Sequence, residues 1–183
     1  RIVYSKMENV NDVNDIDHPS VRNCIKHCDL KLGLEIHHDA DLPARSGLGS
    51  SSTFTVGMLN CFFSLKGVNA SRKKLASQAI LVEQEKIGEN VGSQDQVHAA
   101  YGGFNHIKFF RNGRFKVNPV NTHNNFIKIL QDHCLLFYTG ISRFASNIAS
   151  SQIKNTPKKK HELNAMKGYV KDALNIIDSG REN

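Results

Sequence analysis

The chain has 183 residues, of which 39% are hydrophobic and 22% are charged, and its formal net charge is +7. This composition is typical of an ordinary soluble globular protein with a sizeable core. No apolar run approaches the ~20 residues that cross a bilayer, so we expect no membrane segment. The positive charge favours anionic partners, which include nucleic acid, membrane surfaces and phosphorylated metabolites.

The four cysteines do not show the paired spacing of a disulfide framework. They are Cys24, Cys28, Cys61 and Cys134. Cys61 lies in an apolar stretch that we expect to be helical, where a buried free thiol is the usual explanation. We therefore predict a reducing, cytoplasmic location.

The N-terminal half of the sequence predicts one strand and two long helices. Residues 1–19 are predicted to form a loop, because asparagine and aspartate crowd this stretch. Residues 30–36 alternate between apolar and polar, the period-two pattern of a half-buried strand. A glycine-rich turn at 43–49 follows, and the sequence then predicts helices over 50–63 and 71–88.

The C-terminal half predicts a hairpin, a buried strand and further helices. A short helix should start at Ser93, and a hairpin over 104–117 should turn at Asn112-Gly113. The apolar run 134–138 is predicted to be a buried strand. It is followed by the helices that the sequence predicts over 142–155 and 160–178. This order of elements predicts an α+β fold, or a two-layer α/β fold, with a domain boundary near 119–130.

A turn rich in glycine and serine joins the predicted strand to the first long helix. It contains Pro43, Arg45, Ser46, Gly47, Leu48, Gly49, Ser50, Ser51 and Ser52. The first amides of the helix would point into this turn, and their partial positive charge suits a phosphate. The serine hydroxyls can bond phosphate oxygens or Mg²⁺, and the arginine adds positive charge. A simple glycine turn with a serine cap is the alternative, but two glycines and three serines favour phosphate binding.

Two carboxylates downstream could support phosphoryl transfer. That chemistry needs a metal to neutralise anionic charge and a group to orient or deprotonate the attacking hydroxyl. Glu83 and Asp95 are candidates because they lie twelve residues apart across a helix end and a turn. The residues alone also allow Glu83 and Glu85 to lie on an exposed helix face. Asp95 could equally be an acid placed favourably at a helix start.

Pro43 and the run Gly47-Leu48-Gly49-Ser50-Ser51-Ser52 resemble the second signature motif of the GHMP kinases, the superfamily of galactokinase and of homoserine, mevalonate and phosphomevalonate kinases. The resemblance implies that this loop wraps the triphosphate of ATP. It also implies that a serine completes the Mg²⁺ shell, Ser51 by position with Ser50 as second choice. It further implies that Glu83 binds the metal, with Glu85 as an alternative, and that Asp95 is the catalytic base.

Residues 88–96 and 101–105 are similar to the subgroup of D-glycero-D-manno-heptose 7-phosphate kinases and related octose kinases. That similarity implies transfer of the γ-phosphate of ATP to a sugar hydroxyl, C1 of the heptose phosphate. It implies a GHMP-kinase-like N-terminal domain over 1–125 and the start of a ferredoxin-like C-terminal domain over 126–183. The family's first and third motifs are absent, so we expect the sequence to be truncated at both ends.

Gly140 and Arg143 lie at a predicted strand-to-helix junction, where amides and a guanidinium could hold a sugar phosphate. A plain helix cap fits these residues equally well.

A nucleic-acid-binding module is an alternative of another class, and basic and aromatic residues over 108–116 favour it. A hairpin with one apolar face explains them more simply, and this alternative leaves Glu83 and Asp95 without a role. We therefore expect a sugar phosphate and ATP as partners, and neither nucleic acid nor a membrane. A homodimer is left open, and a catalytically inactive nucleotide-binding relative of the kinases is the remaining alternative.

Overall fold

The computed structural model describes residues 1–41, 47–122, 125–137 and 145–179. The chain divides into two compact units, which are described separately below. One comprises Arg1–Gly102 with Ile141–Ala149, and the other comprises Gly103–Gly140 with Ser150–Asn183. Helices and strands both occur, as the α+β prediction requires. No helix of the described part is long and apolar enough to span a bilayer.

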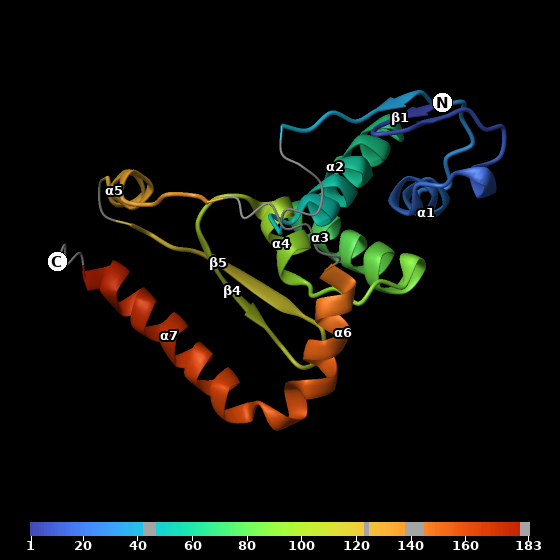
Figure 1. Cartoon of the computed structure of the whole chain (residues 1–183). Helices are drawn as coiled ribbons and strands as arrows, with labels where there is room; N and C mark the ends of the chain where they lie inside the picture. Colours follow the sequence, from blue (N-terminus) through green and yellow to red (C-terminus); the bar gives the residue numbers. More distant parts are fainter. Residues whose placement is uncertain (42–46, 123–124, 138–144, 180–183) are drawn as a thin grey trace. The chain divides into compact units, whose positions relative to one another are not determined.

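Three very short strands form a small sheet at the start of the first unit. They are β1 (Ile2–Val3), β2 (Met7–Glu8) and β3 (Ile36–His37). The order is β2-β1-β3, with β1 antiparallel to β2 and parallel to β3 (Figure 1). Most of the strand predicted over 30–36 is therefore wrong. The backbone at its start is engaged in the turn after the preceding helix, where the Leu30 amide donates to the Ile25 carbonyl at 3.2 Å.

A helix that the sequence analysis missed, α1 (Pro19–His27), follows a 3₁₀ turn, η1 (Val13–Asp15). His18 caps it through Nδ1, which accepts from the Val21 amide, and the proline occupies the first helical position, where its missing N–H costs nothing. The signal was present in the sequence. The buried residues recur at helical spacing: Val21, Cys24, Ile25 and Cys28.

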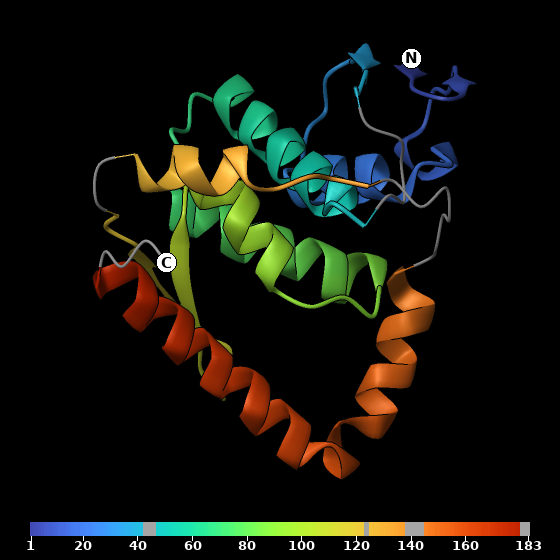
Figure 2. The ribbon, with the colours of Figure 1, turned by 60° about the vertical axis from the view of Figure 1, so that its left-hand side comes forward.

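The helices predicted over 50–63 and 71–88, and the short helix predicted to start at Ser93, are confirmed. They are α2 (Ser50–Leu65), α3 (Arg72–Leu81) with its π-helical continuation η2 (Val82–Ile87), and α4 (Gln94–Tyr101). Ser71 caps α3, since its Oγ accepts from the Lys74 amide at 3.2 Å. Helix α2 packs against α1, α3 and α4, which Figures 1 and 2 show from two directions. Leu59 of α2 is fully buried at the centre of this core.

The carboxylate of Glu8 fastens the N-terminal segment to α1. It is buried, and it accepts hydrogen bonds from Tyr4 Oη at 2.9 Å, from the Asp17 amide at 2.6 Å and from the His18 amide at 3.2 Å. Burial alone would raise the pKa of Glu8, but these hydrogen bonds outweigh it and hold the pKa below its ordinary value. Burial and the same carboxylate raise the pKa of Tyr4 to about 12.

The second unit contains the predicted hairpin, which is confirmed. Strands β4 (Asn105–Phe109) and β5 (Phe115–Pro119) pair antiparallel, with Ile107 opposite Val117. The remaining elements are α5 (Phe126–Asp132), which was not predicted, η3 (Thr156–Lys158), α7 (Lys160–Ser179), and α6 (Ala145–Asn155), whose start belongs to the first unit. Helices α6 and α7 agree with the two predicted helices.

The buried strand predicted over 134–138 is wrong for residues 134–137, and Tyr138 lies outside the described residues. Leu135, Leu136 and Phe137 are 82%, 80% and 79% exposed. A buried strand needs a neighbour for its backbone N–H and C=O groups. No described strand pairs with this segment.

Removing the Glu8 carboxylate should weaken the fold in a pH-dependent way. The pKa of Glu8 in the folded protein lies below its ordinary value of 4.5. The ionised carboxylate therefore contributes its full stabilisation of the fold above pH 4.5, and this contribution is lost as the pH falls through the folded-state pKa. Urea unfolding of Glu8→Gln should show lower stability at neutral pH and a shallower loss of stability between about pH 5 and pH 3. Tyr4→Phe, which removes one donor, should cost about 1 kcal/mol. An unchanged acid dependence in Glu8→Gln would contradict this account.

Candidate active site

The described part of the glycine-serine turn leads directly into α2. Gly49 is the N-cap residue, and its left-handed backbone (φ 71°, ψ 23°) is accessible to glycine at little cost. The first intrahelical bond runs from the Thr53 amide to the Gly49 carbonyl at 3.0 Å. The amides of residues 50–52 precede that bond and belong to the donors that a helix leaves without an internal acceptor. The N-terminus of α2 therefore has the donors and the dipole that suit a phosphate.

The carboxylate of Asp95 lies beside this turn. Asp95 is in the first turn of α4, which packs against α2. A Cβ atom placed on Gly49 would lie 3.4 Å from both Cγ and Oδ2 of Asp95. The predicted base and the predicted phosphate loop thus meet in the structure, and the missing side chain of the glycine makes room for the acid.

Glu83 lies in the π-helical turn η2 and is only 1% exposed, so the interpretation as an exposed helix face does not apply to it. Its Oε2 atom accepts hydrogen bonds from Ser52 Oγ of α2 at 2.8 Å and from Gln96 Nε2 of α4. Glu83 therefore joins η2 to both helices that bear the turn and the base. π-Helical turns inside helices are frequent at functional sites.

The charge of Glu83 is not neutralised by any ion pair found among the described residues. Its second oxygen, Oε1, is buried and has no hydrogen-bond partner among the described residues, and the same is true of Thr55 Oγ1 and Gln96 Oε1. Burial, reinforced by the charge of Glu83, raises the pKa of Glu89. Burial, Cys28 and Glu83 together raise the pKa of Cys24 to about 12. Burying a carboxylate without a cation is unfavourable. The free oxygen of Glu83 and the neighbouring serine hydroxyls are the oxygen ligands that suit a divalent cation.

Within the described ranges, no three His, Cys, Asp or Glu side chains are grouped as a metal site. Mg²⁺ usually takes one or two carboxylates and completes its shell with water and substrate phosphates.

The other predicted residues of the site are placed less centrally. Ser51 and Leu48 are exposed, Ser50 is half-buried and Glu85 is exposed. Ser52, which was predicted only as part of the phosphate loop, is the serine that contacts Glu83. The assignment of the metal to Ser51 stays a prediction. Five predicted residues lie outside the described part of the chain: Pro43, Arg45, Ser46, Gly140 and Arg143.

Sequence reasoning missed Gln96. A glutamine on a short helix is ordinarily taken as solvated, yet this side chain is completely buried against Glu83. The available signal was its position directly after Asp95, in a segment singled out for its motif.

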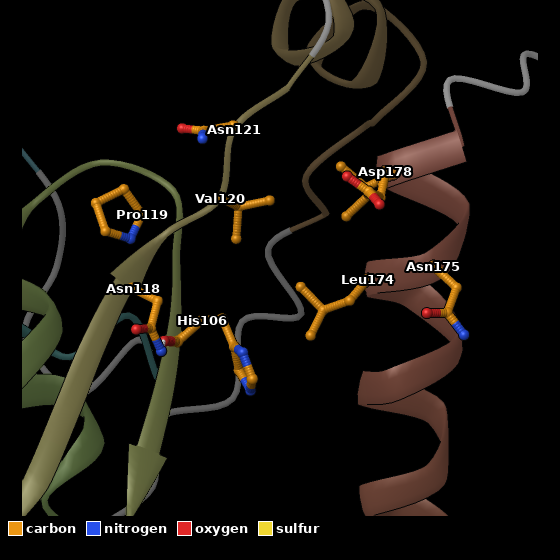
Figure 3. Close-up of a pocket in the computed structure, with 9 residues that line it drawn as sticks. His106, Asn118, Pro119, Val120, Asn121, Leu174, Asn175 and Asp178 are labelled. Atoms are coloured by element: carbon orange, nitrogen blue, oxygen red, sulfur yellow. Dashed lines mark hydrogen bonds between the residues drawn. The ribbon is translucent and has the colours of Figure 1, made fainter.

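A separate pocket of about 290 Å³ lies in the second unit, between the hairpin and α7. Figure 3 shows Leu174 extending from α7 toward the strands that carry His106 and Asn118. Among the described residues of its lining, Asp178 is the one carboxylate, and none is a predicted site residue.

Residues 19–103 match the family model described as the GHMP kinases N terminal domain. This range contains the described part of the turn, Glu83 and Asp95. Together with the fold and the motif, the match shows that residues 19–103 belong to the GHMP kinase family as its N-terminal domain.

The relatives are sugar kinases. The chain is 33% identical over 148 residues to D-glycero-alpha-D-manno-heptose 7-phosphate kinase of Campylobacter jejuni, a match that covers 81% of this chain and 43% of that protein. It is 31% identical to galactokinase of Pyrococcus furiosus, over 66% of this chain and 32% of the relative. The chain thus spans less than half the length of either relative.

Solved structures agree with this relationship. The crystal structure of a D-glycero-D-manno-heptose 1-phosphate kinase from Bacteroides thetaiotaomicron matches with a TM-score of 0.55 at 31% identity, over 60% of this chain and 38% of that one. A crystal structure from Campylobacter jejuni matches with a TM-score of 0.59, also at 31% identity, over 85% of this chain and 49% of that one.

Gly49→Ala should weaken nucleotide binding and stability together. A left-handed backbone costs a non-glycine residue roughly 1–2 kcal/mol, and the new Cβ would lie in van der Waals contact with the Asp95 carboxylate, 3.4 Å away. Gly57→Ala, in the interior of α2, is the matched control. It meets no atom within 4 Å, and alanine should stabilise the helix by about 1 kcal/mol. Urea unfolding measures the stability of the two variants, and titration with a fluorescent ATP analogue measures their nucleotide affinity. Equal stability and equal affinity in Gly49→Ala and Gly57→Ala would contradict the assignment of the phosphate site to the turn at Gly49.

Proposed function

We propose that this protein is an ATP-dependent sugar kinase that transfers the γ-phosphate of ATP to a hydroxyl of a sugar phosphate. One observation carries the proposal. Glu83, a buried carboxylate that has no counter-ion among the described residues, is hydrogen-bonded to a serine of the phosphate loop, and a second carboxylate, Asp95, lies against a glycine of the same loop. These are the parts that phosphoryl transfer requires: donors for the phosphates, a ligand for a divalent cation and a group for the attacking hydroxyl.

Each part has a distinct task in the proposed reaction. The amides at the start of α2 bind phosphate oxygens, and Arg45 of the same turn is proposed to add a positive charge. Glu83 and Ser51, with Ser50 as the second choice, would hold Mg²⁺, which when bound would supply positive charge to the phosphates. Asp95 accepts a hydrogen bond from the sugar hydroxyl and takes its proton as the oxygen bonds to the γ-phosphorus. The bond between that phosphorus and the bridging oxygen of ADP breaks, and ADP leaves.

The proposed acceptor is a heptose phosphate, with C1 of D-glycero-D-manno-heptose 7-phosphate as the site of transfer. The names of the relatives support this class of sugar, although they differ in the position of the phosphate. Gly140 and Arg143 are proposed to contact the sugar phosphate. A boundary between N-terminal and C-terminal domains near residue 125 and a reducing, cytoplasmic location belong to the same proposal.

The alternatives have less support. A nucleic-acid-binding module gives no role to Glu83 or Asp95, and the relatives are kinases of small sugars. An inactive nucleotide-binding relative gives no role to the carboxylate of Asp95 beside the phosphate loop.

Asp95→Asn should lower turnover by orders of magnitude, because the amide cannot take the proton of the sugar hydroxyl. ATP binding should be kept. The measurement is ADP release with a panel of sugars and sugar phosphates that includes heptose 7-phosphate. Asp172→Asn on the exposed side of α7 is the matched control and should retain full activity. Undiminished turnover in Asp95→Asn would rule out the assigned base.

Single substitutions can separate a direct role of Ser51 at the metal from an indirect role of Ser52 through Glu83. Ser52→Ala removes the hydroxyl that donates to Glu83, whereas Ser51→Ala changes an exposed residue. If Ser52 supports the metal through Glu83, its loss should raise the Mg²⁺ concentration for half-maximal turnover by about 10–100-fold. Ser51→Ala should show a similar rise only if Ser51 itself binds the metal. The Mg²⁺ dependence of turnover, measured for both variants, decides between them.

A further inference from the structure

The side chain of Gln96 is fully buried and reaches the carboxylate of Glu83. Its exposed fraction is 0%, and Nε2 donates to Glu83 Oε2. Burying an amide requires loss of its hydration, which only a good hydrogen bond offsets. The roles proposed above for Asp95, Glu83 and the loop serines leave this buried amide unexplained.

Both hydrogen bonds to Glu83 go to the same oxygen. Ser52 Oγ donates to Oε2 at 2.8 Å from α2, and Gln96 Nε2 donates to Oε2 from α4. The other oxygen, Oε1, is buried, and no residue of the described part of the chain hydrogen-bonds to it. Two donors from two different helices fix the plane of the carboxylate and direct its free oxygen.

We propose that Gln96 is a positioning residue for the kinase reaction. Its amide, together with the Ser52 hydroxyl, occupies Oε2 of Glu83 and so presents Oε1 to the divalent cation. This inference rests on the proposed function, since it assumes that Glu83 holds the metal.

The place of Gln96 in the sequence links the two carboxylates of the site. Gln96 directly follows Asp95 in the first turn of α4. The same helical turn therefore positions Asp95 beside Gly49 and the Gln96 amide within hydrogen-bond distance of Glu83. Any rotation of α4 would therefore move the proposed base, Asp95, together with the amide that donates to Glu83. Outer hydrogen bonds of this kind typically change metal affinity by about 10–100-fold.

The test uses Mn²⁺ as the probe, with a non-hydrolysable ATP analogue and no sugar, in the full chain. Gln96→Met removes the amide and keeps an unbranched side chain. Gln78→Met is the matched control, because Gln78 is half-buried and its side chain is also hydrogen-bonded, at 2.6 Å to His27 on α1, away from the carboxylates. Electron paramagnetic resonance of free Mn²⁺ gives the dissociation constant, and binding of the analogue in EDTA gives the metal-free affinity.

Gln96→Met should raise the Mn²⁺ dissociation constant by about 10–100-fold and leave the metal-free nucleotide affinity unchanged. Gln78→Met should change neither. Mn²⁺ affinity in Gln96→Met equal to that of the unchanged chain, while Glu83→Gln loses it, would overturn the inference and leave the proposed function intact. Mn²⁺ affinity that survives Glu83→Gln as well would remove the proposed metal role of Glu83 and the inference with it.

A measurement on the unchanged chain covers the case in which Gln96→Met does not fold. Mg²⁺ added to the complex with the analogue should shift the side-chain amide resonances of Gln96 in a nitrogen-proton correlation spectrum, because its acceptor becomes a metal ligand. Those of Gln78 should stay in place. Gln96 resonances that do not move on addition of Mg²⁺ would overturn the inference.

Discussion

The first unit is organised around one buried carboxylate, that of Glu83. It lies in a π-helical turn and is hydrogen-bonded both to the helix that begins at the glycine-serine turn and to the helix that bears Asp95. A buried charge of this kind is tolerated only when donors and a cation compensate it. The described residues supply donors to one oxygen only. The incomplete compensation is unfavourable for stability alone, and it is what a metal-binding carboxylate requires.

Much of this site could be predicted because it depends on local sequence. The run from Gly47 to Ser52 combines glycines, serines and a helix start, and the structure places Gly49 in the left-handed conformation at that start. Asp95 was recognisable as an acid at a helix start near a second motif. The helices α2, α3 and α4 followed from apolar periodicity and from caps such as Ser71.

Other features depend on contacts that no local pattern reveals. The sequence could not distinguish a buried Glu83 from an exposed one, because its burial comes from α2 and α4 and not from its own neighbours in the chain. The same holds for Gln96 and for the choice of Ser52 over Ser51 as the partner of Glu83. The predicted strand at 134–137 failed for a related reason, since an apolar run becomes a strand only where a neighbour pairs with it.

The most direct test of the account is a crystal structure of the full chain with Mn²⁺ and a non-hydrolysable ATP analogue. Anomalous scattering would locate the metal independently of the phosphates. We predict a Mn²⁺ peak on Glu83 Oε1, with the phosphates at the amides that follow Gly49 and the carboxylate of Asp95 facing the γ-phosphate. A metal bound elsewhere, with Glu83 still buried and linked only to Ser52 and Gln96, would contradict the account.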